Sequence, residues 1–224
     1  MKRSRGIAII DSRLDFPPVE EARPDGLLAV GGDLSPERLL LAYQSGIFPW
    51  SSDPITWWSP NPRSILPVGG LHVSRSLART LRRQIWQYTF DTAFESVVRA
   101  CASPAPGREE TWIEEAIIRA YTALHHRGHA HSIEVWQDRT LVGGIYGVAL
   151  GGFFAGESMF HRADDASKAA LVVLMEHLEK LGFSLFDTQV ASPLTRQMGA
   201  VDIPRPEYLV RLQQALTANV AFRA

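Results

Sequence analysis

Cysteine is nearly absent from this chain, because Cys101 is the only one among its 224 residues. A single cysteine cannot form an internal disulfide, which favours a reducing compartment. We interpret Cys101 as a small core residue on a helix. An excess of charge is lacking as well, since the formal net charge is −1. The overall charge therefore identifies no partner, and only a local run of charge could do so.

Long hydrophobic runs are also missing. The basic N-terminal stretch MKRSRGIAIIDSR contains no long apolar segment of the kind that a secretory signal needs. The longest uncharged run, LVGGIYGVALGGFFAG at 141–156, is too short to span a bilayer, and its glycines favour a hairpin. We therefore expect a cytoplasmic protein without a membrane partner.

Common cofactor and nucleophile motifs do not occur. The segment GGDLS at 31–35 lacks the Lys of a phosphate-binding loop, and no G-x-G-x-x-G is present. The sequence Gly156-Glu157-Ser158 is not a serine-nucleophile motif, so a covalent intermediate is disfavoured. Four histidines lie at 125–131, but an expected helix end and strand start scatter them, and no cysteine or acid completes a set. We expect neither a metal nor a cofactor.

Proline and glycine crowd residues 17–70, which predicts a loop-rich first third with short elements. One helix is clear within it. Ser35 is a plausible N-cap, Pro36 takes the first helical position and Gly46 follows the last turn. The apolar face of this helix would include Tyr43.

Beyond residue 70 the sequence alternates between helical and strand periods. The pairs Thr92–Glu95 and Thr111–Glu114 have capping-box spacing and mark the starts of two helices. The expected elements are, in order, helices 73–84, 91–102 and 111–127, strands 131–137, 141–149 and 153–159, helix 167–181, strand 184–190 and helix 206–216. This order indicates an α+β or α/β domain from about residue 90 onward.

A stripe of arginines lies on the helix expected at 73–84. Four of them follow the 3.6-residue period of one helix face: Arg75, Arg79, Arg82 and Arg83. Together with Arg63 they give the segment 61–90 five positive charges and no acid. Such a face suits contact with phosphates, because four arginines without balancing acids are unusual for solubility alone. A solvated surface is the alternative interpretation.

Two apolar runs each lead to a carboxylate. Glu157 follows the uncharged run 141–156 at once, and Asp187 lies in the block SLFDTQ at 184–189. Charged residues are rarely buried without a partner or a task. An apolar pocket with acidic and amide groups at its mouth would suit a ligand with an apolar side chain and a cationic amine. A core strand that ends in a solvated acid is the alternative for either run.

Six collinear blocks of the sequence resemble one family. They are GLLAVGGDLSPERLLLAYQSGIFPW (26–50), WWSPNPRSIL (57–66), TWI (111–113), GHAHSIEVW (128–136), LVGGIYGVALGGFFAGESMF (141–160) and FDTQ (186–189). These blocks closely resemble bacterial leucyl/phenylalanyl-tRNA–protein transferase, and the match runs from about residue 16 to 210. Because several independent blocks match in order, the resemblance is specific.

The resemblance implies an aminoacyltransferase that binds aminoacyl-tRNA. It would move Leu, Phe (and Met) to the N-terminal Arg or Lys of acceptor proteins and so mark them for protein degradation by the N-end rule. The implied fold is α+β. A small Pro/Gly-rich N-terminal domain, residues 1–70, would precede a catalytic domain, residues 71–224, that resembles the acyl-CoA-dependent N-acetyltransferase fold. The expected meander, helix and strand agree with that fold.

The resemblance also assigns roles to residues. Asp187 and Gln189 match the pair proposed as catalytic, and Glu157 matches an acid at the substrate site. An apolar pocket for the aminoacyl side chain and the tRNA 3′ adenine would be lined by the matching positions Trp112, Ile145, Phe154, Met159 and Phe186. Ile145 and Phe186 replace the Met and Ile of better-known members, which leaves the ranking of Leu, Phe and Met open.

The implied chemistry is modest. An ester is aminolysed by an α-amino group whose reference pKa is about 8, so no protein nucleophile is required and positioning supplies most of what is needed. An amide is a very poor base, so we do not expect Gln189 itself to take the proton. Asp187 could orient Gln189 and stabilise positive charge on the attacking nitrogen. Water or the ribose of the leaving tRNA could be the final proton acceptor.

Two alternatives come from other classes of protein. One is a catalytically inactive tRNA- or RNA-binding protein of the same fold, against which the intact Asp187 and Gln189 argue. The other is a CoA-dependent N-acetyltransferase. Such enzymes carry a Gly-rich turn for the CoA pyrophosphate, whereas this chain has HRADDASK at 161–168, with Asp164 and Asp165 and no glycine. These acids would repel a pyrophosphate.

Overall fold

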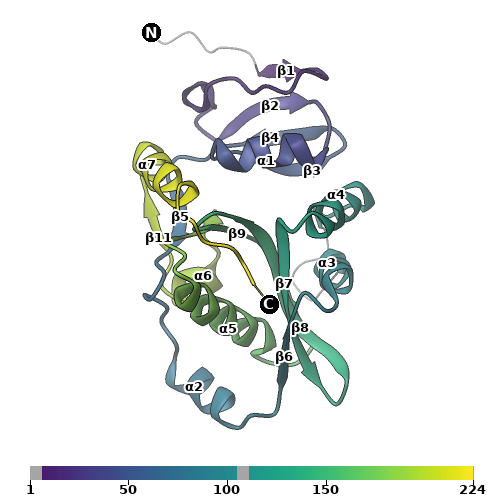
Figure 1. Ribbon diagram of the computed structural model, residues 1–224, viewed down its shortest axis with the longest axis vertical. Helices are drawn as coiled ribbons and strands as arrows, with labels where there is room; N and C mark the ends of the chain where they lie inside the picture. Colours follow the sequence, from purple (N-terminus) through teal and green to yellow (C-terminus); the bar gives the residue numbers. More distant parts are fainter. Residues whose placement is uncertain (1–6, 105–110, 224) are drawn as a thin grey trace.

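The chain folds into two β-sheets, and buried residues of both sheets contribute to one apolar cluster, while a second cluster lies on the other face of the larger sheet. A computed structural model describes residues 7–104 and 111–223 (Figure 1). The smaller sheet has four strands in the order β1-β2-β4-β3. Its strands are β1 (Ala8–Ile10), β2 (Leu27–Gly31), β3 (Phe48–Ser52) and β4 (Ile55–Trp58). The short 3₁₀-helix η1 (Val19–Glu21) precedes β2, and helix α1 (Pro36–Gln44) lies between β2 and β3 in the chain.

The larger sheet has seven strands in the order β11-β5-β10-β9-β8-β7-β6. Its strands are β5 (Arg63–Leu66), β6 (Gln87–Phe90), β7 (Ala130–Gln137), β8 (Thr140–Leu150), β9 (Phe153–His161), β10 (Leu185–Gln189) and β11 (Val201–Ile203). All neighbours are antiparallel except β9 and β10, which are parallel. The predicted boundary at residue 70 remains a proposal, and β5, which precedes it, pairs with β10 and β11 in this sheet.

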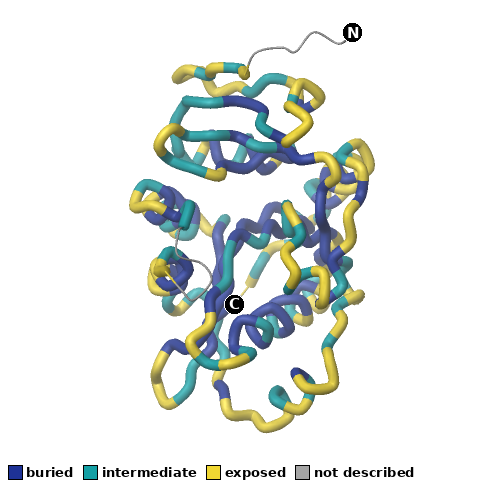
Figure 2. The backbone as a smooth tube through the Cα atoms, turned by 180° about the vertical axis from the view of Figure 1, so that it is seen from behind, coloured by how far each residue is buried: buried dark blue, intermediate teal, exposed yellow. Residues whose placement is uncertain are grey.

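Helices cover both faces of the larger sheet (Figure 1). The helices are α2 (Arg75–Arg82), α3 (Phe94–Ala102), α4 (Glu115–His126), α5 (Ala166–Leu181), α6 (Pro193–Gln197) and α7 (Arg205–Leu216). Helix α5 packs on β7, β8 and β9 from one side, and α3 and α4 pack from the other. Buried positions gather on the central strands and on α5 (Figure 2). Among the described residues, no helix is both long and apolar enough to cross a membrane.

Most of the expected helices and strands are confirmed, and their local chemistry explains their ends. The Ser35 hydroxyl accepts a hydrogen bond from the Arg38 amide at the start of α1. Gly182, with φ +84°, ends α5 in the left-handed conformation that glycine adopts without strain. Asp138 and Arg139 both have positive φ and form the two-residue turn between β7 and β8. The predicted α+β class is therefore confirmed.

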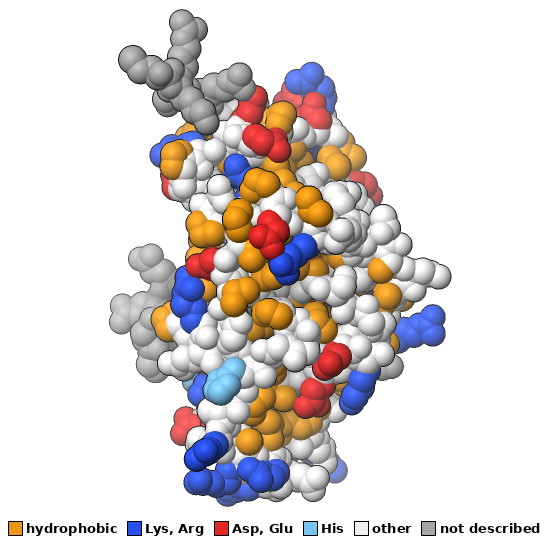
Figure 3. Space-filling model, turned by 90° about the vertical axis from the view of Figure 1, so that its left-hand side faces the viewer, with side chains coloured by type: hydrophobic (Ala, Val, Ile, Leu, Met, Phe, Trp, Pro, Cys, Tyr) orange, Lys and Arg blue, Asp and Glu red, His pale blue; other side chains and the backbone are white. Residues whose placement is uncertain are grey.

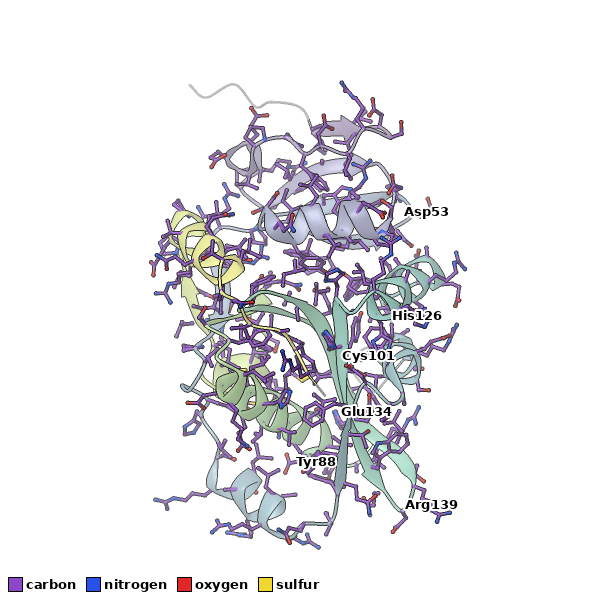
Figure 4. All side chains as sticks on the ribbon, viewed as in Figure 1. Asp53, Tyr88, Cys101, His126, Glu134 and Arg139 are labelled. Atoms are coloured by element: carbon purple, nitrogen blue, oxygen red, sulfur yellow. The ribbon has the colours of Figure 1, made fainter. Side chains whose placement is uncertain are left out.

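Both predicted capping boxes are wrong, because their threonines have other partners. Helix α3 begins at Phe94 without a side-chain cap. The Thr92 hydroxyl instead donates, at 2.8 Å, to the buried carboxylate of Glu134. Glu134 lies on β7 (Figure 4). Helix α4 begins at Glu115, also without a side-chain cap, and the Thr111 hydroxyl accepts from the Ile113 amide. Cys101 is a buried residue of α3, as expected.

Candidate functional site

A pocket of about 290 Å³ lies where the smaller sheet meets the larger one. Its walls come from β3, β8, β9, α5, β10, α6 and the segment that precedes α4. The lining residues are Phe48, Pro49, Trp50, Trp112, Ile145, Gly156, Glu157, Ser158, Met159, Leu171, Phe186, Thr188, Gln189, Val190, Ser192 and Thr195. The pocket therefore combines an apolar interior with a few polar groups, which is typical of ligand sites.

The pocket exists because β9 and β10 pair over only part of their length. Their register ends at the pair Asp187–Ala155, and the residues that follow on each strand line the pocket. The pairing of β8 with β9 shifts at the same level, so that Glu157 is the extra residue of a β-bulge. A side chain at Gly156 would come within 2.8 Å of the Phe186 ring, so glycine there allows that ring to lie against the strand.

Four of the five apolar residues expected at the donor pocket line it: Trp112, Ile145, Met159 and Phe186. The fifth, Phe154, does not. It is 1% exposed and stacks behind Phe186, with 5.6 Å between the ring centroids. Phe154 therefore supports the pocket wall without reaching the cavity.

Sequence reasoning missed the contribution of the smaller sheet. Phe48, Pro49 and Trp50 of β3 form one wall of the pocket, and Trp50 is 37% exposed. The only signal was the apolar segment IFPW in a polar, loop-rich region. Nothing in that segment identifies the sheet that it faces, so its role could not be derived from the sequence.

Asp187 is fully buried and does not line the pocket. The Arg63 guanidinium donates to both of its oxygens, Nε to Oδ1 at 2.9 Å and Nη2 to Oδ2 at 2.6 Å, and the Tyr208 hydroxyl donates to Oδ2 at 2.8 Å. Burial by itself would lower the pKa of Arg63, but the facing Asp187 carboxylate holds that pKa above its ordinary value. Arg63 is thus a buried partner of Asp187, which corrects its place in the predicted basic run.

Gln189 is held in place by both acids. Its backbone N–H donates to Asp187 Oδ1, and its side-chain Nε2 donates to Glu157 Oε1, each at 2.8 Å. Its φ of +61° is unusual for a residue with a side chain and marks local strain of the kind found at functional sites. The expectation that Asp187 orients Gln189 thus has a geometric basis in the main chain.

Glu157 lines the pocket and is 9% exposed. The Tyr121 hydroxyl donates to its Oε2 at 3.0 Å. Burial raises the pKa of Glu157 to about 7, and the nearby Asp187 carboxylate acts in the same direction. The polar groups of Tyr43, Tyr121 and Gln189 oppose the rise. The carboxyl group can therefore change its protonation state near neutral pH.

The expected arginine stripe is exposed on α2. Arg75, Arg79, Arg82 and the C-cap residue Arg83 all lie at the surface, while Leu77 packs inward. Lys and Arg side chains gather at the lower end of the face in Figure 3, the end where α2 lies in Figure 1. The Arg82 guanidinium donates only to the carbonyl of Ala78 on its own helix among the described residues.

Two of the four clustered histidines lie beside the same acid. His131 lies 2.7 Å from the Asp91 carboxylate and stacks on Phe222, and His125 lies 3.9 Å from that carboxylate and stacks on Phe94. Within residues 7–104 and 111–223, no group of three His, Cys, Asp or Glu side chains is arranged to hold a metal ion.

Comparison with known proteins gives one consistent family. The leucyl/phenylalanyl-tRNA protein transferase model matches residues 65–213, and the model of that family's N-terminal domain matches residues 32–61. The leucyl/phenylalanyl-tRNA–protein transferase of Shewanella pealeana is 54% identical over 198 residues, which cover 87% of this chain and 84% of the relative. That of Syntrophotalea carbinolica is 53% identical over 205 residues, 90% of this chain and 89% of the relative.

Solved structures are more distant. L-PGS from Bacillus licheniformis has a TM-score of 0.42 at 11% identity and covers 74% of this chain and 54% of its own. A GCN5-related N-acetyltransferase from Kribbella flavida has a TM-score of 0.39 at 11% identity, and the match covers 71% of this chain and 57% of the acetyltransferase chain. Structural similarity at these scores supports no functional argument, so the assignment rests on the sequence matches. On those matches, the chain belongs to the leucyl/phenylalanyl-tRNA protein transferase family.

Proposed function

We propose that this chain transfers Leu, Phe and Met from aminoacyl-tRNA to the N-terminal Arg or Lys of acceptor proteins, which marks them for degradation by the N-end rule. The observation that carries this proposal is the pocket. The chain is a member of this transferase family, and its apolar cavity is also lined by Gln189 and Glu157, which are hydrogen-bonded to each other and can position an amine beside an ester. An apolar aminoacyl side chain would enter it, and the ester carbonyl would lie near Gln189.

The pocket favours a donor of moderate size and no charge. The lining residues Ile145, Met159, Leu171 and Phe186 offer only apolar contacts. A difference of one methylene is worth about 1–3 kcal/mol in such a site, so Leu, Phe and Met should compete. A charged side chain would lose its hydration without gaining a partner, which costs far more.

Gln189 is the candidate catalytic residue, and Asp187 acts through it. No described residue donates to the side-chain oxygen of Gln189. That oxygen is therefore available to accept an N–H of the attacking amine and to align its lone pair with the ester carbon. Asp187 fixes the Gln189 backbone, and Arg63 neutralises the Asp187 charge, so Asp187 is a positioning residue.

CoA is not part of this proposal. The acetyltransferase-like fold expected from the sequence would place a CoA pyrophosphate at the turn before α5. Here Asp164 and Asp165 lie in that turn. Asp165 is the N-cap residue of α5 and has a left-handed backbone conformation, and its carboxylate lies 2.7 Å from the Lys168 ammonium group. These carboxylates do not fit a pyrophosphate, because like charges repel.

The proposal is tested with labelled Leu-tRNA and a peptide that begins with Arg. We expect the label to move to the peptide, and to remain on tRNA when the peptide begins with an acetylated residue. Acetyl-CoA in place of Leu-tRNA should give no product. A competition among tRNAs charged with Leu, Phe, Met, Val and Lys tests the pocket, and equal transfer of Lys and Leu would contradict it.

We also propose that the α2 arginines contact tRNA phosphates, because these four exposed cations have no acidic partner among the described residues. Changing Arg75, Arg79, Arg82 and Arg83 to Glu should weaken tRNA binding. The slope of log K for tRNA binding against log salt concentration should decrease in magnitude by about 1 for each lost phosphate contact. A matched variant changes the net charge equally at Arg13, Arg23, Arg119 and Arg211. Equal effects of the two variants would show that the α2 stripe has no special role.

A further inference from the structure

We propose that Glu157 accepts the proton of the attacking amine and returns it to the departing ribose oxygen, and that the buried Tyr121 and Tyr43 are positioning residues for its carboxyl group. This inference rests on the proposed transfer reaction and identifies the proton acceptor within it. It starts from the position of two carboxylates near Gln189, of which only one reaches the cavity.

Asp187 is excluded as the acceptor by its partners. Its two oxygens receive hydrogen bonds from Arg63, from the Tyr208 hydroxyl and from the Gln189 amide. A proton on this carboxyl group would break the two-point contact with a guanidinium that is 1% exposed. An unpaired buried cation is strongly unfavourable, so Asp187 keeps its ion pair with Arg63 and is not the proton acceptor.

Glu157 has the opposite surroundings. It faces the pocket, no cation pairs with it among the described residues, and its direct donors are the neutral groups Tyr121 and Gln189. A proton on Glu157 therefore breaks no ion pair. Because burial and Asp187 raise its pKa to about 7, Glu157 can both take a proton and release one at neutral pH.

The tyrosines behind Glu157 cannot compete with it for the proton. Tyr43 of α1, Tyr121 of α4 and Tyr146 of β8 are all fully buried, and burial raises the pKa of each hydroxyl well above its ordinary value. They therefore remain protonated. The Tyr43 hydroxyl is hydrogen-bonded to the Tyr121 hydroxyl, which in turn donates to Glu157 Oε2. Because these hydrogen bonds use Oε2, the proposed proton transfer involves Oε1, which also accepts from Gln189 Nε2.

The other charged groups that act on Glu157 come from β5 and β10. Asp187 raises the pKa of Glu157, and Arg63 interacts with both carboxylates. Burial is the largest cause of the raised pKa of Glu157, and the charge of Asp187 adds to it.

The proposed step conserves protons. The lone pair of the neutral amine attacks the ester carbon, and a C–N bond forms. The nitrogen then loses one proton to the Glu157 carboxylate. The C–O bond to the ribose breaks, and the departing oxygen takes that proton from Glu157. The products are an amide and a free ribose hydroxyl, and Glu157 returns to its ionised form.

The first experiment measures transfer from Leu-tRNA to an Arg peptide as a function of pH, at saturating concentrations of both substrates. For the unchanged protein, kcat should fall below about pH 7, since only ionised Glu157 accepts a proton. Glu157→Gln should lower kcat by about 100-fold or more, change the KM for Leu-tRNA little, and remove the acid limb. A raised KM for Leu-tRNA with unchanged kcat would instead make Glu157 a binding group for the donor amine and overturn the proposal.

Tyr121→Phe provides a second test that does not depend on removing Glu157. Loss of the hydroxyl removes a hydrogen bond that lowers the pKa of Glu157, so the acid limb of kcat should move to higher pH. The control is Tyr88→Phe on β6 (Figure 4), a residue that does not line the pocket, and this variant should leave the limb unchanged. An acid limb that does not move in Tyr121→Phe overturns the proposal, because titration of the substrate amine would be the same in every variant.

These outcomes are separable from failure of the proposed function. If the unchanged protein transfers no Leu to the Arg peptide, the proposed function itself is wrong. If it does transfer Leu but Glu157→Gln has the same kcat and pH profile, only the assignment of the proton acceptor is wrong.

Discussion

Asp187 and Glu157 are buried carboxylates on neighbouring strands, yet the fold treats them differently. Asp187 is paired with the Arg63 guanidinium and does not line the cavity. Glu157 sits on a β-bulge, faces the cavity and receives hydrogen bonds from neutral donors. The comparison teaches that burial alone does not give an acid its role. The cationic partner gives Asp187 a structural role, whereas the neutral partners leave Glu157 able to titrate.

The two acids also bring different parts of the chain together. The Asp187 cluster joins β10 to Arg63 of β5 and Tyr208 of α7. The Glu157 cluster joins β9 to Tyr121 of α4 and, through it, to Tyr43 of α1 beside the smaller sheet. Gln189 touches both acids. Its position therefore depends on two clusters that assemble from distant segments.

The largest effect should come from breaking the Asp187 pair. Arg63→Met leaves a buried carboxylate without its cation, which should cost about 3–5 kcal/mol of unfolding free energy. The matched control is Arg211→Met, which breaks an exposed pair with Glu207 and should cost about 0.5 kcal/mol or less. Urea denaturation measures both. Equal losses in the two variants would contradict the scaffold role of Arg63.

The next effect concerns Glu157 and depends on pH. Its ordinary pKa is 4.5, and the fold raises it to about 7. Between these values the folded protein holds a proton that the unfolded chain has lost, so this group lowers stability as the pH rises through the window. Glu157→Gln removes the penalty.

Relative to the unchanged protein, Glu157→Gln should therefore gain on the order of 3 kcal/mol between pH 4.5 and 7. Denaturation curves of both proteins across this range measure the gain. A difference in unfolding free energy that is constant with pH would mean that Glu157 does not titrate as the structure implies.

A smaller effect should distinguish a buried tyrosine hydroxyl that donates to a charged group from one without a partner among the described residues. Tyr208→Phe removes a donor to the charged Asp187 and should cost about 1.5–3 kcal/mol. Tyr146→Phe is its control, because the equally buried Tyr146 hydroxyl has no hydrogen-bond partner among the described residues. Removal of an unpartnered buried hydroxyl should be neutral or stabilising. A larger loss of unfolding free energy for Tyr146→Phe than for Tyr208→Phe would contradict this view.

Local sequence patterns predicted the long elements of the larger sheet and its helices well. The β8–β9 hairpin and α5 follow from apolar periodicity together with their turn and cap glycines, which act over a few residues. The short strands β1 to β6 and β11 were not predicted, because three to five residues carry too little periodicity to distinguish a strand from a loop, whereas the equally short β10 was recognised by its apolar run. Both capping-box errors arose where a tertiary partner or another local turn competed for a threonine.

The sequence by itself determined the fold class, the family, the apolar runs that carry Glu157 and Asp187, and the exposed arginine face of α2. These follow from local periodicity and from collinear blocks, which need no knowledge of contacts. Only the tertiary structure decided that Arg63 belongs to Asp187 and not to the basic run, and that Phe154 stands behind the pocket. It also brought Trp50, Tyr43 and Tyr121 to the site. The reason is physical: Arg63 and Asp187 are 124 positions apart, and a hydrogen bond over that separation leaves no trace in local sequence.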